Sequence, residues 1–249
     1  MAAPTEQRYT DFATFRRRAA DPTLSAHEKI DDRRNLRAGK LEPILADIRA
    51  KLPQLTLRAQ RVVDIGSGCG VLPDTLIHDA EILGHQLTCI DSPEMLAALP
   101  ASPALSKVAA EFPHCPEFIT AARATCNAVL AYSMFHYVFE HGNPWGFVDA
   151  ALTLLAPGGR LLLGDVPNRS KRDRFLASEV GRRLHKAHGG SEPNLVPRFN
   201  QLVPAEIDDA VLWGLAARAR AAGFDAYILP QPEALPLADR REDLLFVRP

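Results

Sequence analysis

The stretch that decides the fold is residues 60–70, which read QRVVDIGSGCG. A short apolar run at 61–65 contains an acid and is followed at once by glycines at positions 66, 68 and 70. A run of this kind, without regular polar alternation, is typical of a strand that is covered on both faces. The next residues, 71–83, have the length and the periodicity of a helix. The stretch therefore predicts a strand, a glycine-rich turn and a helix, in the order from which parallel α/β sheets are built.

The same alternation continues along the chain. Buried strands are expected at 61–65, 86–91, 127–132 and 160–165, and helices at 71–83, 93–99 and 143–155. Strands that alternate with helices predict a doubly wound, mostly parallel sheet. The runs 224–229 and 243–247 are separated by a Pro-rich gap without room for a crossover helix. We therefore expect an antiparallel hairpin at one edge, in a Rossmann-like sheet of seven strands.

Helical segments flank this core on both sides. The apolar spacing in 38–52 predicts an amphipathic helix, and we expect residues 1–58 to form an N-terminal helical cap. Residues 59–249 would then form the main domain, with a helical insertion at about 167–205.

The insertion is expected to contain one long helix over 170–187. Ser170 and Asp173 have the spacing of a capping box, with Asp in the place of Glu. Leu176, Val180 and Leu184 follow at helical spacing, and we expect this apolar stripe to pack in the core.

Composition removes several classes of function. The chain has 249 residues, with 29 Lys and Arg against 30 Asp and Glu, and a net charge of −1. This balance disfavours a dedicated nucleic-acid binder. The four cysteines form no CxxC pair and have no histidine at ligand spacing, so neither a metal site nor a disulfide framework is expected. Without a secretory apolar region or a membrane-spanning run, we expect a cytoplasmic protein with no membrane span.

The spacing of the glycines predicts the kind of ligand. A dinucleotide fingerprint requires a third glycine at the position of Val71. The observed G-x-G-x-G, with an acid two residues before the first glycine, is the pattern that holds an amino-acid tail and a ribose. The residues of this predicted cofactor loop are Asp64, Gly66, Ser67, Gly68 and Gly70.

Two further features complete a resemblance. Asp91 ends the second strand 21 residues after Gly70, and residues 155–161 read LAPGGRL. With the glycine loop, these features resemble the class I S-adenosylmethionine-dependent methyltransferases. The resemblance implies S-adenosylmethionine as cofactor, with Asp91 on its ribose hydroxyls and Ser92 and Met95 beside the adenine. The family commonly has an acid or amide after strand three that binds the adenine amino group, and residues 118–123 offer none.

The acceptor is expected beside the sulfonium, near the ends of strands four and five. There Ser133 is expected to contact the cofactor and Tyr137 the substrate. His136 could take a proton from a hydroxyl, or it is a structural residue at the start of a helix. Asp165 could act as a base or accept a hydrogen bond from the substrate, or it caps the next turn. Both are candidate catalytic residues.

The basic insertion suggests the charge of the acceptor. Residues 167–200 contain 8 basic and 3 acidic side chains, which favours an anionic acceptor unless they only form a solvated surface. The candidate substrate contacts here are Asn168, Arg172, His188 and Arg198. Residues 164–175 also resemble a stretch of bacterial methyltransferases that modify surface carbohydrates, which favours a sugar-like acceptor.

The leading hypothesis is methyl transfer from S-adenosylmethionine to a small molecule that is anionic or sugar-like. We expect transfer to oxygen by in-line displacement. The alternatives are an RNA methyltransferase and a non-catalytic nucleotide-binding scaffold of the same fold.

Overall fold

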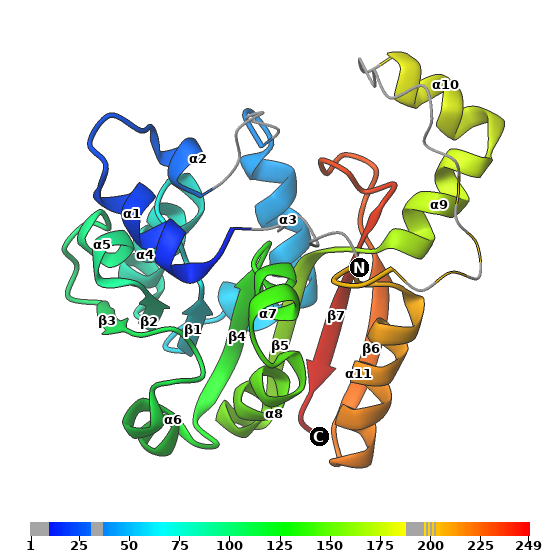
Figure 1. Ribbon diagram of the computed structural model, residues 1–249. Coiled ribbons are helices and arrows are strands. Elements are labelled where there is room, and N and C mark those ends of the chain that lie inside the picture. The colour runs from blue at the N-terminus through cyan, green and yellow to red at the C-terminus, as the bar shows by residue number, and fades with distance from the viewer. Residues whose placement is uncertain (1–9, 31–36, 188–196, 198, 200, 202) are drawn as a thin grey trace, which may run out of the picture.

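A computed structural model describes residues 10–30, 37–187, 197, 199, 201 and 203–249. These residues form a seven-stranded sheet with helices on both faces (Figure 1), in the order β3-β2-β1-β4-β5-β7-β6. The five strands from β1 to β5 are parallel, and β7 runs antiparallel between β5 and β6. The predicted fold class is confirmed, including the hairpin at one edge.

The strands follow the apolar runs of the sequence closely. They are β1 (Arg61–Ile65), β2 (Gln86–Asp91), β3 (Leu105–Ala109), β4 (Cys126–Tyr132), β5 (Leu155–Pro167), β6 (Asp225–Pro230) and β7 (Arg241–Val247). Ile65 pairs with Ile90 in register, so the loops after β1 and β2 leave the sheet at the same level. Residues at these two strand ends can therefore meet.

Two hydrophobic cores explain why the strands are apolar on both faces. Val62 and Leu162 belong to one core, and their neighbours Val63 and Leu161 belong to the other. Successive side chains point to opposite faces of a sheet, so each face buries every second residue. The first core includes α3 (Leu41–Lys51), α4 (Val71–Leu83) and α5 (Pro93–Ala97), and the second includes α6 (Pro116–Ala122), α7 (Phe135–His141), α8 (Pro144–Leu154) and α11 (Asp209–Ala221).

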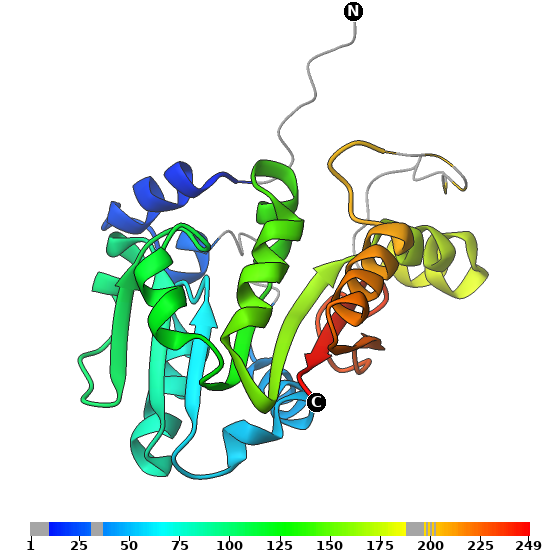
Figure 2. The same cartoon turned by 90° about the horizontal axis from the view of Figure 1, so that it is seen from below.

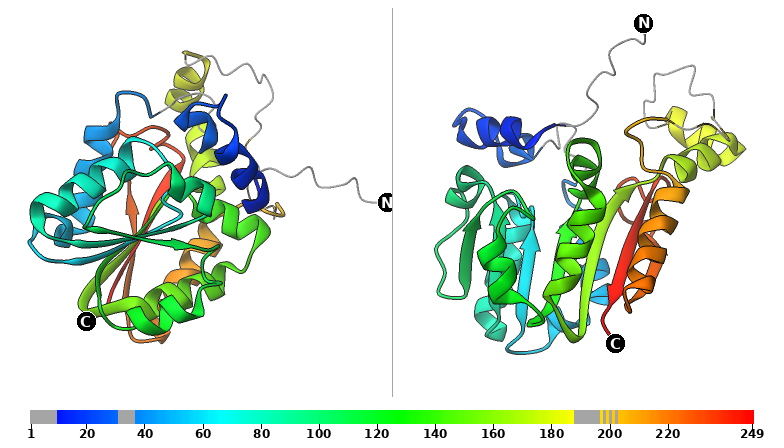
Figure 3. Two further views of the ribbon diagram at one scale, coloured as in Figure 1. Left: turned by 90° about the vertical axis from the view of Figure 1, so that its left-hand side faces the viewer. Right: turned by 60° about the horizontal axis from the view of Figure 1, so that its bottom comes forward.

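The N-terminal segment contributes to two parts of the structure. Helices α1 (Phe12–Ala20) and α2 (Ala26–Lys29) lie across the carboxyl ends of the first strands (Figures 1 and 3). By contrast, Ile44, Leu45 and Ile48 of α3 are buried in the same core as β1. Helix α3 thus packs as part of the sheet domain, and the domain boundary at residue 58 remains a prediction.

The insertion after β5 differs from the single helix that we expected. It contains α9 (Arg169–Ala177) and α10 (Glu179–Ala187), which project beyond the edge of the sheet (Figures 1 and 2). Asn168, not Ser170, caps α9, because its side chain accepts a hydrogen bond from the Lys171 amide. Val180 and Leu184 are exposed, so the prediction that they pack in the core is wrong.

No helix in the described part of the chain combines the length and the apolar character that crossing a bilayer requires.

Candidate active site

The glycine loop between β1 and α4 brings main chain close to other segments. Gly66 and Gly68 have positive φ angles of 69° and 63°, which side chains other than glycine rarely adopt. A Cβ atom on Gly68 would lie 2.9 Å from Cγ2 of Ile30, and one on Gly66 would lie 3.0 Å from Cγ of Met134. The loop therefore needs glycine for its conformation and for the room around it.

Asp91 ends β2 beside this loop. Its Oδ2 accepts a hydrogen bond of 2.8 Å from the Gly68 amide, and its Oδ1 accepts one of 2.6 Å from the Ser92 amide. Burial raises the pKa of Asp91, and the two amides oppose that rise because they stabilise the carboxylate. Asp91 thus links the end of β2 to the glycine loop that follows the neighbouring strand β1.

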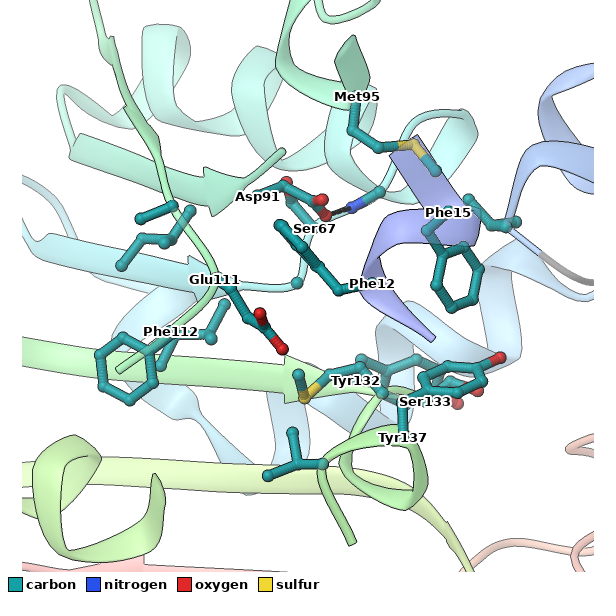
Figure 4. A pocket seen from close by; sticks show the side chains of 18 of the residues that line it. Phe12, Phe15, Ser67, Asp91, Met95, Glu111, Phe112, Tyr132, Ser133 and Tyr137 are labelled. Carbon is teal, nitrogen blue, oxygen red and sulfur yellow. Dashed lines mark hydrogen bonds between the residues drawn. The ribbon is translucent and has the colours of Figure 1, made fainter. Parts of the chain in front are cut away.

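A cavity of about 340 Å³ opens over the carboxyl ends of these strands. This is where open α/β sheets bind ligands, and the volume falls in the range of small-molecule sites. Figure 4 shows side chains from several elements around it. Of the predicted cofactor residues, Gly66, Ser67, Gly68, Asp91, Met95 and Ser133 line the cavity, and so does the predicted substrate residue Tyr137.

Glu111 also lines the cavity, and the sequence prediction missed it. We took residues 118–123 as the segment that follows strand three, but these residues lie in or beside α6, and the strand is Leu105–Ala109. This edge strand is half exposed and has a lysine in its middle, so it lacks the apolar run that marked the others. An acid does follow strand three, two residues after its end, and the expected departure from the family pattern is wrong.

Aromatic side chains from the N-terminal segment close part of the cavity. Phe12 and Phe15 of α1 line it, and Figure 4 shows Phe15 beside Tyr137. These two rings meet edge to face, with centroids 4.8 Å apart. Sequence spacing could not predict this role, because α1 ends about forty residues before β1 begins.

A polar cluster lies at the ends of β4 and β5. Arg37 donates through Nη2 to Asp165 Oδ2 at 2.8 Å and to Ser133 Oγ. Arg241 donates through Nη1 to the same Asp165 oxygen at 2.7 Å, to its backbone oxygen at 2.9 Å and to Ser133 Oγ at 3.4 Å. Both arginines were missed in the sequence. A carboxylate held by two guanidinium groups is poorly placed to act as a general base, so the structure favours a positioning role for Asp165.

His136 is buried next to this cluster. Its ring lies 4.0 Å from that of Tyr137, measured between centroids. Burial lowers the pKa of His136 well below its usual value, and the nearby charges of Arg241 and Arg37 lower it further. The lowered pKa favours the unprotonated ring, which can accept a hydrogen bond but binds a proton weakly.

Three other predicted cofactor residues do not line the cavity. Asp64 is buried under the glycine loop, where burial and the charge of Asp91 raise its pKa to about 7. Gly70 stands at the N-cap position of α4, and the Ser92 side chain caps α5 by accepting from the Met95 amide. None of these three is among the residues that line the cavity.

The predicted substrate residues of the insertion have structural partners. The Asn168 amide donates to Asp209 at 2.7 Å and to Glu242, and Arg172 forms ion pairs with Asp173 and Glu206. Neither residue lines a described cavity, so substrate contact by these two is not supported by their placement. His188 and Arg198 lie outside the described residues.

Solved structures share this architecture. The plantazolicin methyltransferase BpumL, in complex with a monoazolic desmethylPZN analogue and S-adenosylhomocysteine, aligns with a TM-score of 0.55 at 13% identity, covering 95% of this chain and 97% of that one. A candidate S-adenosylmethionine-dependent methyltransferase from Listeria monocytogenes aligns with a TM-score of 0.54 at 17% identity, covering 84% and 98%. The chain has the class I methyltransferase fold.

The methyltransferase domain of bacterial CtHen1-C shares this methyltransferase fold too, with a TM-score of 0.50 at 17% identity over 86% of this chain and 98% of that one. No family model matches the sequence, and no curated protein matches it either. The likeness therefore concerns the fold alone.

Proposed function

We propose that this protein is an S-adenosylmethionine-dependent methyltransferase that acts on a small acceptor. The observation that carries the proposal is the composition of the main cavity. The glycine loop, Asp91 and Glu111 come from three successive strand ends and line the same space. These groups match an amino-acid tail, a ribose and an adenine, in that order along the sheet.

The residues present fit this cofactor. The Ser67 Oγ is buried, and among the described residues it has no hydrogen-bond partner beyond a weak interaction with the Cys89 thiol. Buried hydroxyls normally have a partner, so a polar ligand group here would supply what the fold does not. Asp91 already accepts two amide hydrogen bonds, but a carboxylate has about four lone-pair sites, which leaves room for ribose hydroxyls. Glu111 would accept from the adenine amino group.

The cofactor supplies an electrophilic methyl group on a positively charged sulfur. The protein's task is then to align the acceptor and to exclude water. Phe12, Phe15 and Tyr137 cover the cavity with apolar surface. Burial and the cationic neighbours lower the pKa of His136, so its unprotonated ring would accept a hydrogen bond from a hydroxyl acceptor rather than hold its proton. A hydroxyl held in this way supports oxygen as the atom methylated.

The proposal is tested by ligand binding and by methyl transfer. S-adenosylhomocysteine at 100 times its dissociation constant should stabilise the folded protein by about 2.7 kcal/mol, which raises the unfolding temperature in a thermal melt. Adenosine and methionine at the same concentration are the matched controls. Transfer of a labelled methyl group from S-adenosylmethionine to small hydroxylated acids and sugars then tests the reaction. The absence of any thermal shift with S-adenosylhomocysteine would contradict the proposal.

A further inference from the structure

A second, smaller cavity adjoins the main one. Its volume is about 100 Å³, and it shares Arg37, Tyr132, Ser133 and Tyr137 with the main cavity. Figure 4 shows the last three of these residues together at one end of the main cavity. The remaining polar lining residues of the second cavity are His136, Asp165 and Arg241. A molecule in this space would lie next to a cofactor in the main cavity.

The charges that line the second cavity do not cancel. Arg37 and Arg241 contribute two positive charges, and Asp165 contributes one negative charge to which both are bound. Behind Asp165, the Asp243 carboxylate accepts from the Asp165 amide at 2.8 Å and from Lys51 at 2.5 Å, and Lys51 also pairs with Asp47 at 2.6 Å. Asp47, Lys51 and Asp243 do not line the second cavity. Among the described side chains that do line it, two positive charges face one negative charge.

The same two arginines also act on His136, which lines the second cavity. The charges of Arg241 and Arg37 both disfavour a proton on this ring, in addition to its burial. Asp165 and Asp243 act in the opposite direction on Tyr132, whose pKa is raised mainly by burial. Among the charged groups, the arginines thus act most strongly on His136 and the acids act most strongly on Tyr132.

Arg241 retains hydrogen-bonding capacity for a ligand. Within the described residues, every hydrogen bond that its side chain donates runs through Nη1. A guanidinium group has five N–H donors arranged as a planar fork, so those on Nη2 and Nε are not engaged by these contacts. Its side chain retains 16% of its exposed surface, which means that the group is reachable.

We propose that the second cavity binds a single anionic group, a carboxylate or a phosphate, on the methyl acceptor, with Arg241 as the main contact and Arg37 as the second. The inference rests on the proposed function, because it assigns the acceptor site of that reaction. A cavity of about 150 Å³ can hold a benzene ring, so the space here suits an anionic group with a few carbon atoms. The anionic group of the acceptor would therefore bind at the ends of β5 and β7, not at the basic insertion after β5.

The test uses three small probes on protein saturated with S-adenosylhomocysteine. Glycerate carries a carboxylate, glycerol 3-phosphate carries a phosphate, and glycerol is neutral. Isothermal titration at constant ionic strength should show binding of one or both anions and none of glycerol. Arg241→Gln should weaken anion binding at least about ten-fold, since charge-assisted hydrogen bonds are lost. Arg241→Lys, which keeps the charge without the fork, should give an intermediate loss.

Arg218→Gln is the matched control, because Arg218 forms an exposed ion pair with Asp149 on another face. The affinity for S-adenosylhomocysteine is measured in every variant and should stay within about two-fold. If Arg241→Gln fails to fold, Arg241→Lys alone carries the comparison. The inference is overturned if neither anion binds, if glycerol binds equally well, or if the Arg241 variants bind the anions like Arg218→Gln. If wild type does not bind S-adenosylhomocysteine, the proposed function fails first.

Discussion

The loops that directly follow β1, β2 and β3 form one part of the main cavity, whereas the second cavity, beside β4, β5 and β7, is formed by side chains from distant parts of the chain. We call the first region, residues 66–68, Asp91 and Glu111, the cofactor half. The second region is the acceptor half, and it comprises Arg37, Ser133, His136, Asp165 and Arg241. The cofactor half depends on backbone geometry, and the acceptor half depends on a balance of buried charges. Changes to the two halves should therefore affect different measurements.

The largest effect is expected from the charge network beneath the acceptor half. Lys51 is buried between Asp47 and Asp243, at 2.6 and 2.5 Å. Lys51→Met leaves two buried carboxylates without their cation and should lower the free energy of unfolding by about 3–5 kcal/mol. Lys40→Met, an exposed lysine at the start of the same helix, should stay within about 0.5 kcal/mol of wild type in urea unfolding.

The decrease in the free energy of unfolding caused by Lys51→Met should also depend on pH. Burial already raises the pKa of Asp243 to about 6, and removal of Lys51 raises it further. An acid whose folded pKa lies above its unfolded value destabilises the protein as pH rises between the two values. The free energy of unfolding of the variant should therefore fall further below that of wild type at pH 8 than at pH 4. Equal losses at both values would contradict the buried charge network.

A substitution at Asp91 should weaken cofactor binding without unfolding the protein. Asp91→Ala removes acceptors for ribose hydroxyls and should weaken S-adenosylhomocysteine binding about 100-fold in isothermal titration, as expected for two charge-assisted hydrogen bonds. Asp149→Asn, an exposed acid, is the control. An affinity within a few-fold of wild type would show that Asp91 does not hold the cofactor.

A substitution at Asp64 tests whether this residue is a buried structural acid or a cofactor contact. Its pKa of about 7 corresponds to a destabilisation that develops as pH rises from about 4 to about 7 and stays above that range. Asp64→Asn should raise the free energy of unfolding at pH 8 by about 2 kcal/mol, since the amide is buried at a smaller cost. Wild type and variant should converge near pH 4 in a urea series. A variant that is less stable at pH 8 would show that the fold needs the carboxylate.

The smallest expected effect concerns Ser67. Ser67→Ala should weaken S-adenosylhomocysteine binding by about three- to ten-fold, the worth of one neutral hydrogen bond. Stability without ligand should change little, because the hydroxyl has only a weak partner within the described residues. A loss of stability with unchanged affinity would assign Ser67 to the fold.

The difference between the halves also explains what the sequence could predict. Asp91 and the glycine loop were found because each follows a buried strand directly, and parallel strands end at the same edge. Glu111 was missed because β3 is a half-exposed edge strand whose weak apolar pattern did not mark it. The order of elements was thus predictable wherever burial on both faces left an apolar run.

The acceptor half depends on contacts that sequence spacing does not reveal. Arg37 and Arg241 lie 128 and 76 residues from the Asp165 that they both bind. The sequence prediction placed the anion-binding cations in the basic insertion instead, where Arg172 forms ion pairs with Asp173 and Glu206. A count of local charge could not show which cations are already paired, because their partners come from elsewhere in the chain.

The most direct test of the account is a crystal structure of the protein with S-adenosylhomocysteine. We predict density in the main cavity, with the amino-acid tail against residues 66–68, the ribose hydroxyls on Asp91 and the adenine near Glu111. Ligand bound elsewhere, or a cavity that stays closed by its own side chains at saturating ligand, would contradict the assignment of this site.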